Sequence, residues 1–187
     1  MIEKAQAVID AVKEKMQGSV TYLDEDLKTY RAGKANPAVF NSVVVNYYGT
    51  MTPIPQVASI ATPDARTMLI QPWDRNLLRP VEKAIMDANL GFTPQNNGEV
   101  IRINIPAITE ERRKELVKKA RNAGENAKVA VRNARRDAIE SLKKLQKEGL
   151  PEYTDKDFED EVQKLTDNFS KKVEEILAAK EKEIMTV

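Results

Sequence analysis

TEERRKELVKKARNAGENAKVAVRNARRDAIESLKKLQK, residues 109–147, is the stretch that decides the fold. Apolar residues recur in it at steps of three and four, the spacing of one face of an α-helix. They are Leu116, Ala120, Ala123, Ala127, Val131, Ala134, Ala138, Leu142 and Leu145. Thr109 followed by two glutamates is typical of a helix start, and Gly149-Leu150-Pro151 ends the pattern. A helix of roughly 38 residues is about 57 Å long. It needs other helices against which to bury its apolar stripe.

Two further stretches have the same periodicity and are predicted to be helices. One covers residues 2–30 and the other begins near residue 154. The apolar positions of the first are Ala5, Ile9, Val12, Met16, Val20, Leu23, Leu27 and Tyr30. Those of the second are Phe158, Val162, Leu165, Phe169, Val173, Ile176 and Ile184. Three long amphipathic helices predict an antiparallel three-helix bundle, formed here by residues 1–30 and 107–187.

Residues 31–106 follow different rules and predict a small α/β domain inserted into the bundle, so that the fold class is α+β. Stretches rich in β-branched and aromatic residues predict strands at 39–48, 56–61, 66–73 and 100–106. Residues 75–89 predict a short helix with Pro80 in its first turn. Two connections, near 31–34 and 105–108, make a plausible hinge. Tyr47 and Tyr48 are interpreted as core residues in preference to an exposed stacking platform.

The composition argues against an enzyme. The chain has no histidine and no cysteine, which removes the commonest general base, the commonest metal ligand and any disulfide. We therefore expect no catalytic residue, no metal site and no cofactor. The N-terminus has no apolar segment of the secretory kind, and no run of residues is apolar enough to cross a membrane. A soluble, cytoplasmic protein is expected.

Charge is distributed unevenly, although the net charge is only +1. Residues 109–136 have a net charge of +6, whereas residues 152–187 have a net charge of −5. On a helical wheel the cations of the first segment gather away from its apolar side, with Glu125 as the one acidic residue among them. They are Lys114, Lys118, Arg121, Lys128, Arg132, Arg135 and Arg136.

This basic stripe permits several interpretations. Most charged faces are merely solvated, but a solvated face usually mixes signs because like charges one turn apart repel. Stacked cations, with arginine prevailing at one end, favour RNA or DNA binding, and the acidic last helix is expected to face away from the nucleic acid. An adaptor for acidic proteins would use the same stripe. A hydrolase based on carboxylates or lysines would need a pocket that no residue spacing here indicates.

Several long motifs resemble those of the bacterial ribosome recycling factor family, and they cover essentially the whole chain. They are RAGKANP (31–37), VVVNYYGTMTPIPQVASI (43–60), VEKAI (81–85), ITEERRKEL (108–116), VAVRNARRDA (129–138) and QKLTDNFSKK (163–172). Lys34 departs from the family pattern, which commonly has arginine there. The positive charge is kept, but lysine does not make the bidentate phosphate contact of arginine.

The resemblance implies an L-shaped protein with a three-helix bundle, a small α/β sandwich domain and a flexible two-strand hinge. It implies a non-enzymatic translation factor that binds the large subunit and ribosomal RNA of the post-termination ribosome. With elongation factor G and GTP hydrolysed by that partner, the factor splits the ribosome and releases its subunits from mRNA. Such a bundle is expected to be a monomer. The resemblance implies RNA contacts by Arg31, Arg113, Arg132 and Arg135, with Arg136 and Lys34 nearby. The basic stripe adds Arg121 and Lys128 to the expected RNA-binding residues as supporting charge.

Overall fold

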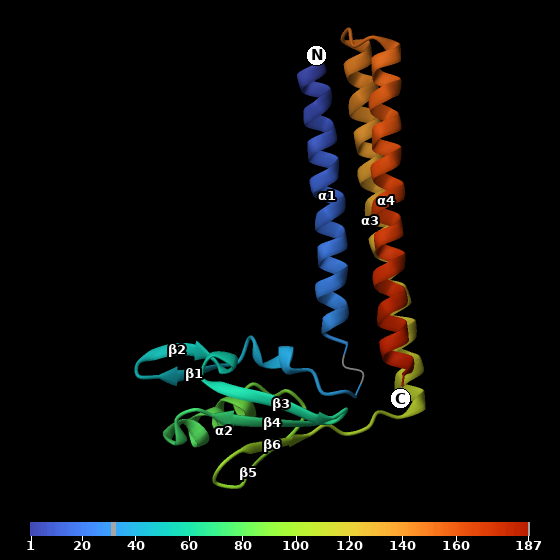
Figure 1. Ribbon diagram of the computed structural model, residues 1–187. Helices are drawn as coiled ribbons and strands as arrows, with labels where there is room; N and C mark the ends of the chain where they lie inside the picture. The colour runs from blue at the N-terminus through green and yellow to red at the C-terminus, as the bar shows by residue number, and fades with distance from the viewer. Residues whose placement is uncertain (31–32, 187) are drawn as a thin grey trace. The chain divides into compact units, whose positions relative to one another are not determined.

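The computed structural model describes residues 1–30 and 33–186, which divide into two compact units (Figure 1). The first comprises Met1–Ala32 and Glu110–Val187, and the second comprises Gly33–Thr109. Each unit has its own hydrophobic core, and each is described by itself.

The first unit is an antiparallel bundle of α1 (Ile2–Lys28), α3 (Glu110–Lys147) and α4 (Glu152–Met185). Each helix packs against both of the others, and α3 runs opposite to α1 and α4 (Figure 1). Every apolar position predicted for α1 is buried, with Met16 and Leu23 almost fully enclosed. Phe158, Leu165 and Ile176 of α4 are half-buried at the edges of its seam. The predicted bundle is therefore confirmed.

One core position of α3 was predicted wrongly. Ala123 is half-buried, and Gly124 takes its place in the apolar seam. A Cβ atom added to Gly124 would lie 2.9 Å from Cδ2 of Leu177 on α4, closer than real Cβ contacts. The close approach of α3 and α4 at this point therefore requires glycine, and the seam shifts by one residue to accommodate it.

The break between α3 and α4 follows the predicted Gly149-Leu150-Pro151 sequence. Gly149 has a φ of +124°, and the N–H of Leu150 donates to the Leu145 carbonyl over 3.0 Å, which closes the end of α3. Leu150 is buried, and Pro151 precedes the first residue of α4. Helix α4 therefore starts at Glu152, slightly earlier than its apolar periodicity indicated.

The second unit contains two antiparallel sheets and one α-helix. A hairpin of β1 and β2 forms the first sheet, and the second has the strand order β3-β4-β6-β5. The elements are η1 (Pro37–Phe40), β1 (Val44–Tyr47), β2 (Thr50–Pro53), η2 (Ile54–Gln56), β3 (Ala58–Asp64), β4 (Thr67–Pro72), η3 (Arg75–Leu77), α2 (Leu78–Asp87), β5 (Pro94–Asn96) and β6 (Ile101–Asn104).

Three details of this unit differ from the sequence prediction. The predicted strand 39–48 begins as a 3₁₀ turn, because Pro37 starts it and the Asn36 side chain accepts the Ala38 N–H. Strand formation is confined to Val44–Tyr47. Strands β2 and β5 were not predicted, since they are short and have little apolar alternation.

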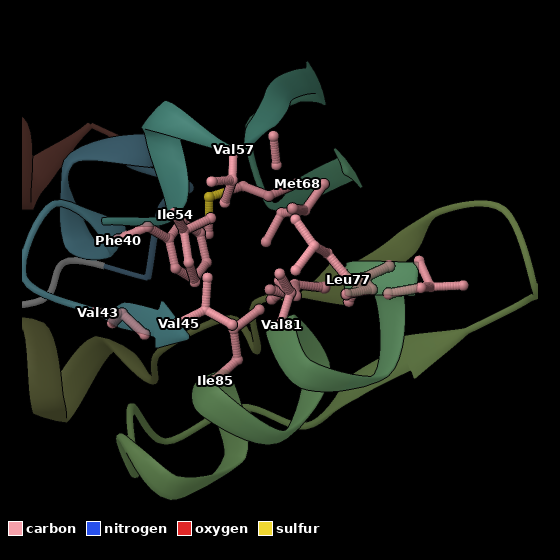
Figure 2. Close-up of a cluster of buried hydrophobic side chains, with 14 residues drawn as sticks. Phe40, Val43, Val45, Ile54, Val57, Met68, Leu77, Val81 and Ile85 are labelled. Atoms are coloured by element: carbon pink, nitrogen blue, oxygen red, sulfur yellow. The ribbon is translucent and has the colours of Figure 1, made fainter. Parts of the chain in front are cut away.

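The core of the second unit lies where the hairpin, the larger sheet and α2 meet. Figure 2 shows Phe40, Val45 and Ile54 pointing toward Val81 and Ile85 of α2. All five side chains are essentially inaccessible to solvent. This continuous core holds the hairpin firmly against the rest of the unit.

The chain enters and leaves this unit at the same place. The Ala35 N–H donates to the Ala65 carbonyl over 2.7 Å, and the Ile105 N–H donates to the Arg66 carbonyl over 2.8 Å. Both ends are therefore tied to the turn between β3 and β4. Half of the first predicted hinge, residues 31 and 32, lies outside the described residues.

Candidate nucleic-acid interface

The cations of α3 form two lines along the helix. Arg121, Lys128 and Arg135 are spaced by seven residues, or about two turns, and follow the edge of α3 next to α4. A second set of exposed cations forms no ion pair with α4 within the described part of the chain, and we call it the outer line, although Lys114 continues the seven-residue spacing of the first set. Its members are Lys114, Lys118, Arg132 and Arg136.

The edge next to α4 is occupied by interhelical ion pairs. Nε of Arg121 donates to Oε1 of Glu181 over 2.7 Å, and Lys128 forms an ion pair with Glu174. The hydrogen bond from Arg121 to Glu181 raises the pKa of the guanidinium above its ordinary value.

The same edge continues toward the α3–α4 turn. Nε of Arg135 donates to Oε1 of Gln163 over 2.8 Å, and Nε2 of Gln163 donates to Asp167 over 2.9 Å. Nζ of Lys143 lies 3.3 Å from Oε1 of Glu159, whose hydrogen bond and charge raise the lysine pKa.

The ion pairs Arg121–Glu181, Lys128–Glu174 and Lys143–Glu159 keep a constant antiparallel register, from which the Arg135–Gln163 contact deviates by about one helical turn. A step of seven residues from Arg121 to Lys128 is matched by seven residues back along α4, from Glu181 to Glu174. The step of fifteen from Lys128 to Lys143 is likewise matched by fifteen back to Glu159. We call these contacts the α3–α4 ladder. At this edge, cations of α3 are therefore paired with carboxylates of α4.

The ladder is a feature that was not recognised in the sequence. Glu174 and Glu181 of α4 lie directly against the basic stripe of α3. Some of the stacked cations on α3 therefore form ion pairs with α4, which the sequence of α3 alone does not reveal. For Arg121 and Lys128, pairing with α4 accounts for the cation without any nucleic acid.

The outer line remains open to a ligand. Arg132 pairs with Glu125 at 3.2 Å, but both side chains are 60% exposed. Arg136 lies 3.6 Å from Asp137, and this pair is also exposed. Lys114 and Lys118 are exposed and form no ion pair with the part of the chain that the structure describes. Exposed pairs contribute little to stability, so phosphates can replace these carboxylates at small cost.

The three other candidate residues are not members of the outer line. Arg113 is half-buried at the start of α3, and its buried Nε has no hydrogen-bond partner within residues 1–30 and 33–186. Lys34 is half-buried at the entry to the second unit. Arg31 lies outside the described residues.

A groove between α1 and α3 was not recognised in the sequence. It has a volume of about 610 Å³ and is lined by small side chains that include Ala123. At one end Nζ of Lys119 lies 4.6 Å from the Tyr30 ring centre. Burial of Tyr30 and its hydrogen bond to Asp26 raise the tyrosine pKa to about 12. The sequence signal that could have indicated this groove is the set of small residues on the facing sides of the two helices. They are Gly18 and Ser19 on α1 and Ala123, Ala127 and Ala130 on α3.

Fold and site define a helical-bundle protein that presents a line of exposed cations. No group of three or more potential metal-ligating side chains is found among the residues that the structure describes. Within those same residues, no helix is long and apolar enough to span a membrane.

Comparison with known proteins assigns the family. The family model for ribosome recycling factor matches residues 23–185. The ribosome-recycling factor of Parabacteroides distasonis is 55% identical over the full length of both chains. A solution structure of the ribosome recycling factor matches all of both chains at 37% identity, with a TM-score of 0.86. The T. thermophilus ribosome recycling factor, in a structure with E. coli elongation factor G bound to the E. coli post-termination complex, is 43% identical. It has a TM-score of 0.65 and covers 97% of this chain and 99% of that one. The chain belongs to the ribosome recycling factor family.

Proposed function

We propose that this protein binds the post-termination ribosome and, together with elongation factor G and GTP, splits it into subunits that are released from mRNA for reuse. The observation that carries the proposal is the family match over the full chain. A structural relative, the T. thermophilus factor, is described together with elongation factor G on the post-termination complex. The chain itself hydrolyses nothing, because the GTPase activity belongs to the partner.

The outer line is the proposed anchor on ribosomal RNA of the large subunit. Lys114 and Arg136 are 22 residues apart, so the line is about 33 Å long. Arginine fits phosphate bidentately, so Arg132 and Arg136 are expected to contribute most. Arg113, at the start of α3, stays in the proposal from the family resemblance. Arg31 and Lys34 stay in the proposal from the family resemblance, and Arg135 contributes through its exposed guanidinium.

The proposal assigns the two parts of the chain different tasks. Residues 1–30 and 107–187 form the RNA-binding bundle, and residues 31–106 form an arm on which elongation factor G acts. Connections near 31–34 and 105–108 act as the hinge. The protein works as a monomer in the cytoplasm, where ribosomes are recycled.

Light scattering of post-termination ribosomes tests this function, since subunit separation lowers the signal. We expect a fall that requires this protein, elongation factor G and GTP together. Arg132→Gln with Arg136→Gln should weaken binding to isolated large subunits at least tenfold and slow splitting. A control that removes two exposed cations from α1, Lys4→Gln with Lys13→Gln, should behave as the wild type. A wild-type protein that splits nothing would refute the function. Equal losses in both variants would refute the anchor.

A further inference from the structure

Residues 35–63 contain no Asp, Glu, Lys or Arg, although charged residues make up 32% of the chain. At that average, about nine would be expected in a stretch of this length. The stretch includes the β1–β2 hairpin and most of β3. Six of its residues belong to the buried core, but the exposed ones also lack charge, which indicates a contact surface that does not depend on ionic attraction.

The hairpin also exposes large apolar side chains, contrary to the sequence prediction. Tyr48 is 81% exposed and Met51 is 61% exposed, and Tyr47 is accessible as well. The interpretation of Tyr47 and Tyr48 as core residues was therefore wrong. Nearby, Trp73 is 70% exposed at the end of β4. We call Tyr47, Tyr48, Met51 and Trp73 the aromatic tip.

Tyr48 occupies a backbone conformation that favours other residues. Tyr48 and Gly49 form the two-residue turn between β1 and β2, with φ angles of +48° and +88°. Two positive φ angles in a hairpin turn are typical of type I′, in which Asn, Asp or Gly is preferred at the first position. A bulky aromatic side chain is unusual there and strains the backbone. Asn46 supports the turn by accepting the Gly49 N–H over 2.8 Å.

The tyrosine is nevertheless held in place from two sides. Its ring packs edge-on against that of Tyr47, with centroids 4.7 Å apart. Its hydroxyl donates to Oδ2 of Asp74 over 3.1 Å, while Oδ1 of Asp74 accepts the Asn76 N–H over 2.9 Å. An exposed ring fixed in this way loses little conformational freedom on binding, which favours affinity.

The chemistry of the aromatic tip fits a protein surface and disfavours nucleic acid. The cores of protein interfaces are depleted of charge and enriched in Tyr, Trp and Met. An aromatic platform for RNA normally has cations nearby that follow the phosphates. The hairpin itself has none, Arg75 beside Asp74 lies 3.8 Å from Glu99, and the carboxylate of Asp74 lies beside the Tyr48 hydroxyl.

We infer that the aromatic tip docks on elongation factor G, with Tyr48 entering an uncharged apolar pocket of that protein. The inference rests on the proposed function, in which the bundle is held by RNA and the second unit receives the action of a protein. Tyr47, Tyr48, Met51 and Trp73 are then the residues that elongation factor G contacts when it acts on the second unit.

Photo-crosslinking tests the contact directly. We would place p-benzoylphenylalanine at position 48 and irradiate post-termination ribosomes that contain elongation factor G and a GTP analogue resistant to hydrolysis. The expected product is a covalent adduct with elongation factor G that disappears when this partner is omitted. The same photo-reactive residue at Tyr153, which is 75% exposed on the bundle, is the matched control and should give no such adduct. Adducts from position 48 only with RNA or a ribosomal protein, or none, would overturn the inference.

Tyr48→Asn tests the function of the contact without endangering the fold, since asparagine suits the turn better than tyrosine. We expect wild-type thermal stability or better, large-subunit affinity within twofold, and splitting at least tenfold slower. Met86→Gln, which changes an exposed apolar residue of α2, should split as the wild type does. Wild-type splitting by Tyr48→Asn would overturn the inference. If the wild-type protein itself does not split ribosomes, the proposed function fails, while the adduct still reports the contact.

Discussion

Replacing the exposed pair Arg132–Glu125 by two glutamines leaves the net charge of the protein unchanged but removes one cation from the outer line. This double variant, Arg132→Gln with Glu125→Gln, therefore separates a local phosphate contact from the overall charge of the protein. Binding to isolated large subunits is the property to measure, because it does not require elongation factor G.

The expected magnitude follows from the number of cations in the outer line. Each phosphate contact contributes roughly 0.7 to 0.9 to the slope of log affinity against log salt, so four contacts give about −2.8 to −3.6. These four contacts alone should then lower the association constant roughly 50- to 150-fold between 50 and 200 mM salt, and the other proposed contacts add equally to this fall in the wild type and in the variant. With one contact fewer, the slope becomes about −2.1 to −2.7 and the fall roughly 20- to 40-fold.

The assay is a titration of fluorescently labelled protein with large subunits at several salt concentrations and constant magnesium. Arg121→Gln with Glu181→Gln is the matched control, since it also removes one cation and one carboxylate but from the α3–α4 ladder. The control should keep the wild-type slope. An outer-line variant with an unchanged slope, or a control that loses as much, would refute the division of α3 into two lines.

Four further outcomes test the packing of the bundle. Gly18→Ala should raise the free energy of unfolding by about 1 kcal/mol, because its Cβ meets nothing and helices favour alanine. Gly124→Ala should fall short of that gain or destabilise, and added Leu177→Ala should abolish this difference in a urea-unfolding double-mutant cycle. Because the pKa of Tyr30 is raised to about 12, its contribution to stability is complete below about pH 10 and lost as the pH rises through 12. As the pH rises, the free energy of unfolding of Tyr30→Phe should therefore fall less than that of the wild type in unfolding curves measured at alkaline pH. Lys143→Met should lower the melting temperature, because it leaves Asp155, which is 1% exposed, without its ion pair. Adding Asp155→Asn to this variant should restore part of the lost melting temperature, since it removes the unpaired buried charge.

The helices were predictable because their signals are local. The spacing of Ala5, Ile9 and Val12 is enough to place a buried face, and the Gly149-Leu150-Pro151 sequence is enough to end a helix. The exchange of Ala123 for Gly124 was not predictable in this way. It depends on Leu177, a residue of another helix whose distance from α3 is set by the whole bundle.

The second unit was predicted less completely for a related reason. Strand β5 has just three residues, and it exists because it pairs with β6, with Gln95 opposite Arg102. Tyr48 follows a β-branched stretch and so was interpreted as a core residue, but it occupies the hairpin turn, where side chains point to solvent. A Tyr-Gly pair is an uncommon I′ turn, so the usual sequence signal of a hairpin was missing.

The candidate site shows most clearly what one helix cannot reveal. The charge of +6 in residues 109–136 was counted along α3 alone, and it includes Arg121 and Lys128, which α4 neutralises. Which cations remain unpaired with α4 depends on the register between α3 and α4. One residue inserted into α3 between Arg121 and Lys128 would rotate the following part of the helix by about 100° relative to the preceding part, so that the two ion pairs with α4 could not both persist. The line of exposed cations is therefore determined as much by the pairing of α3 with α4 as by the basic residues themselves.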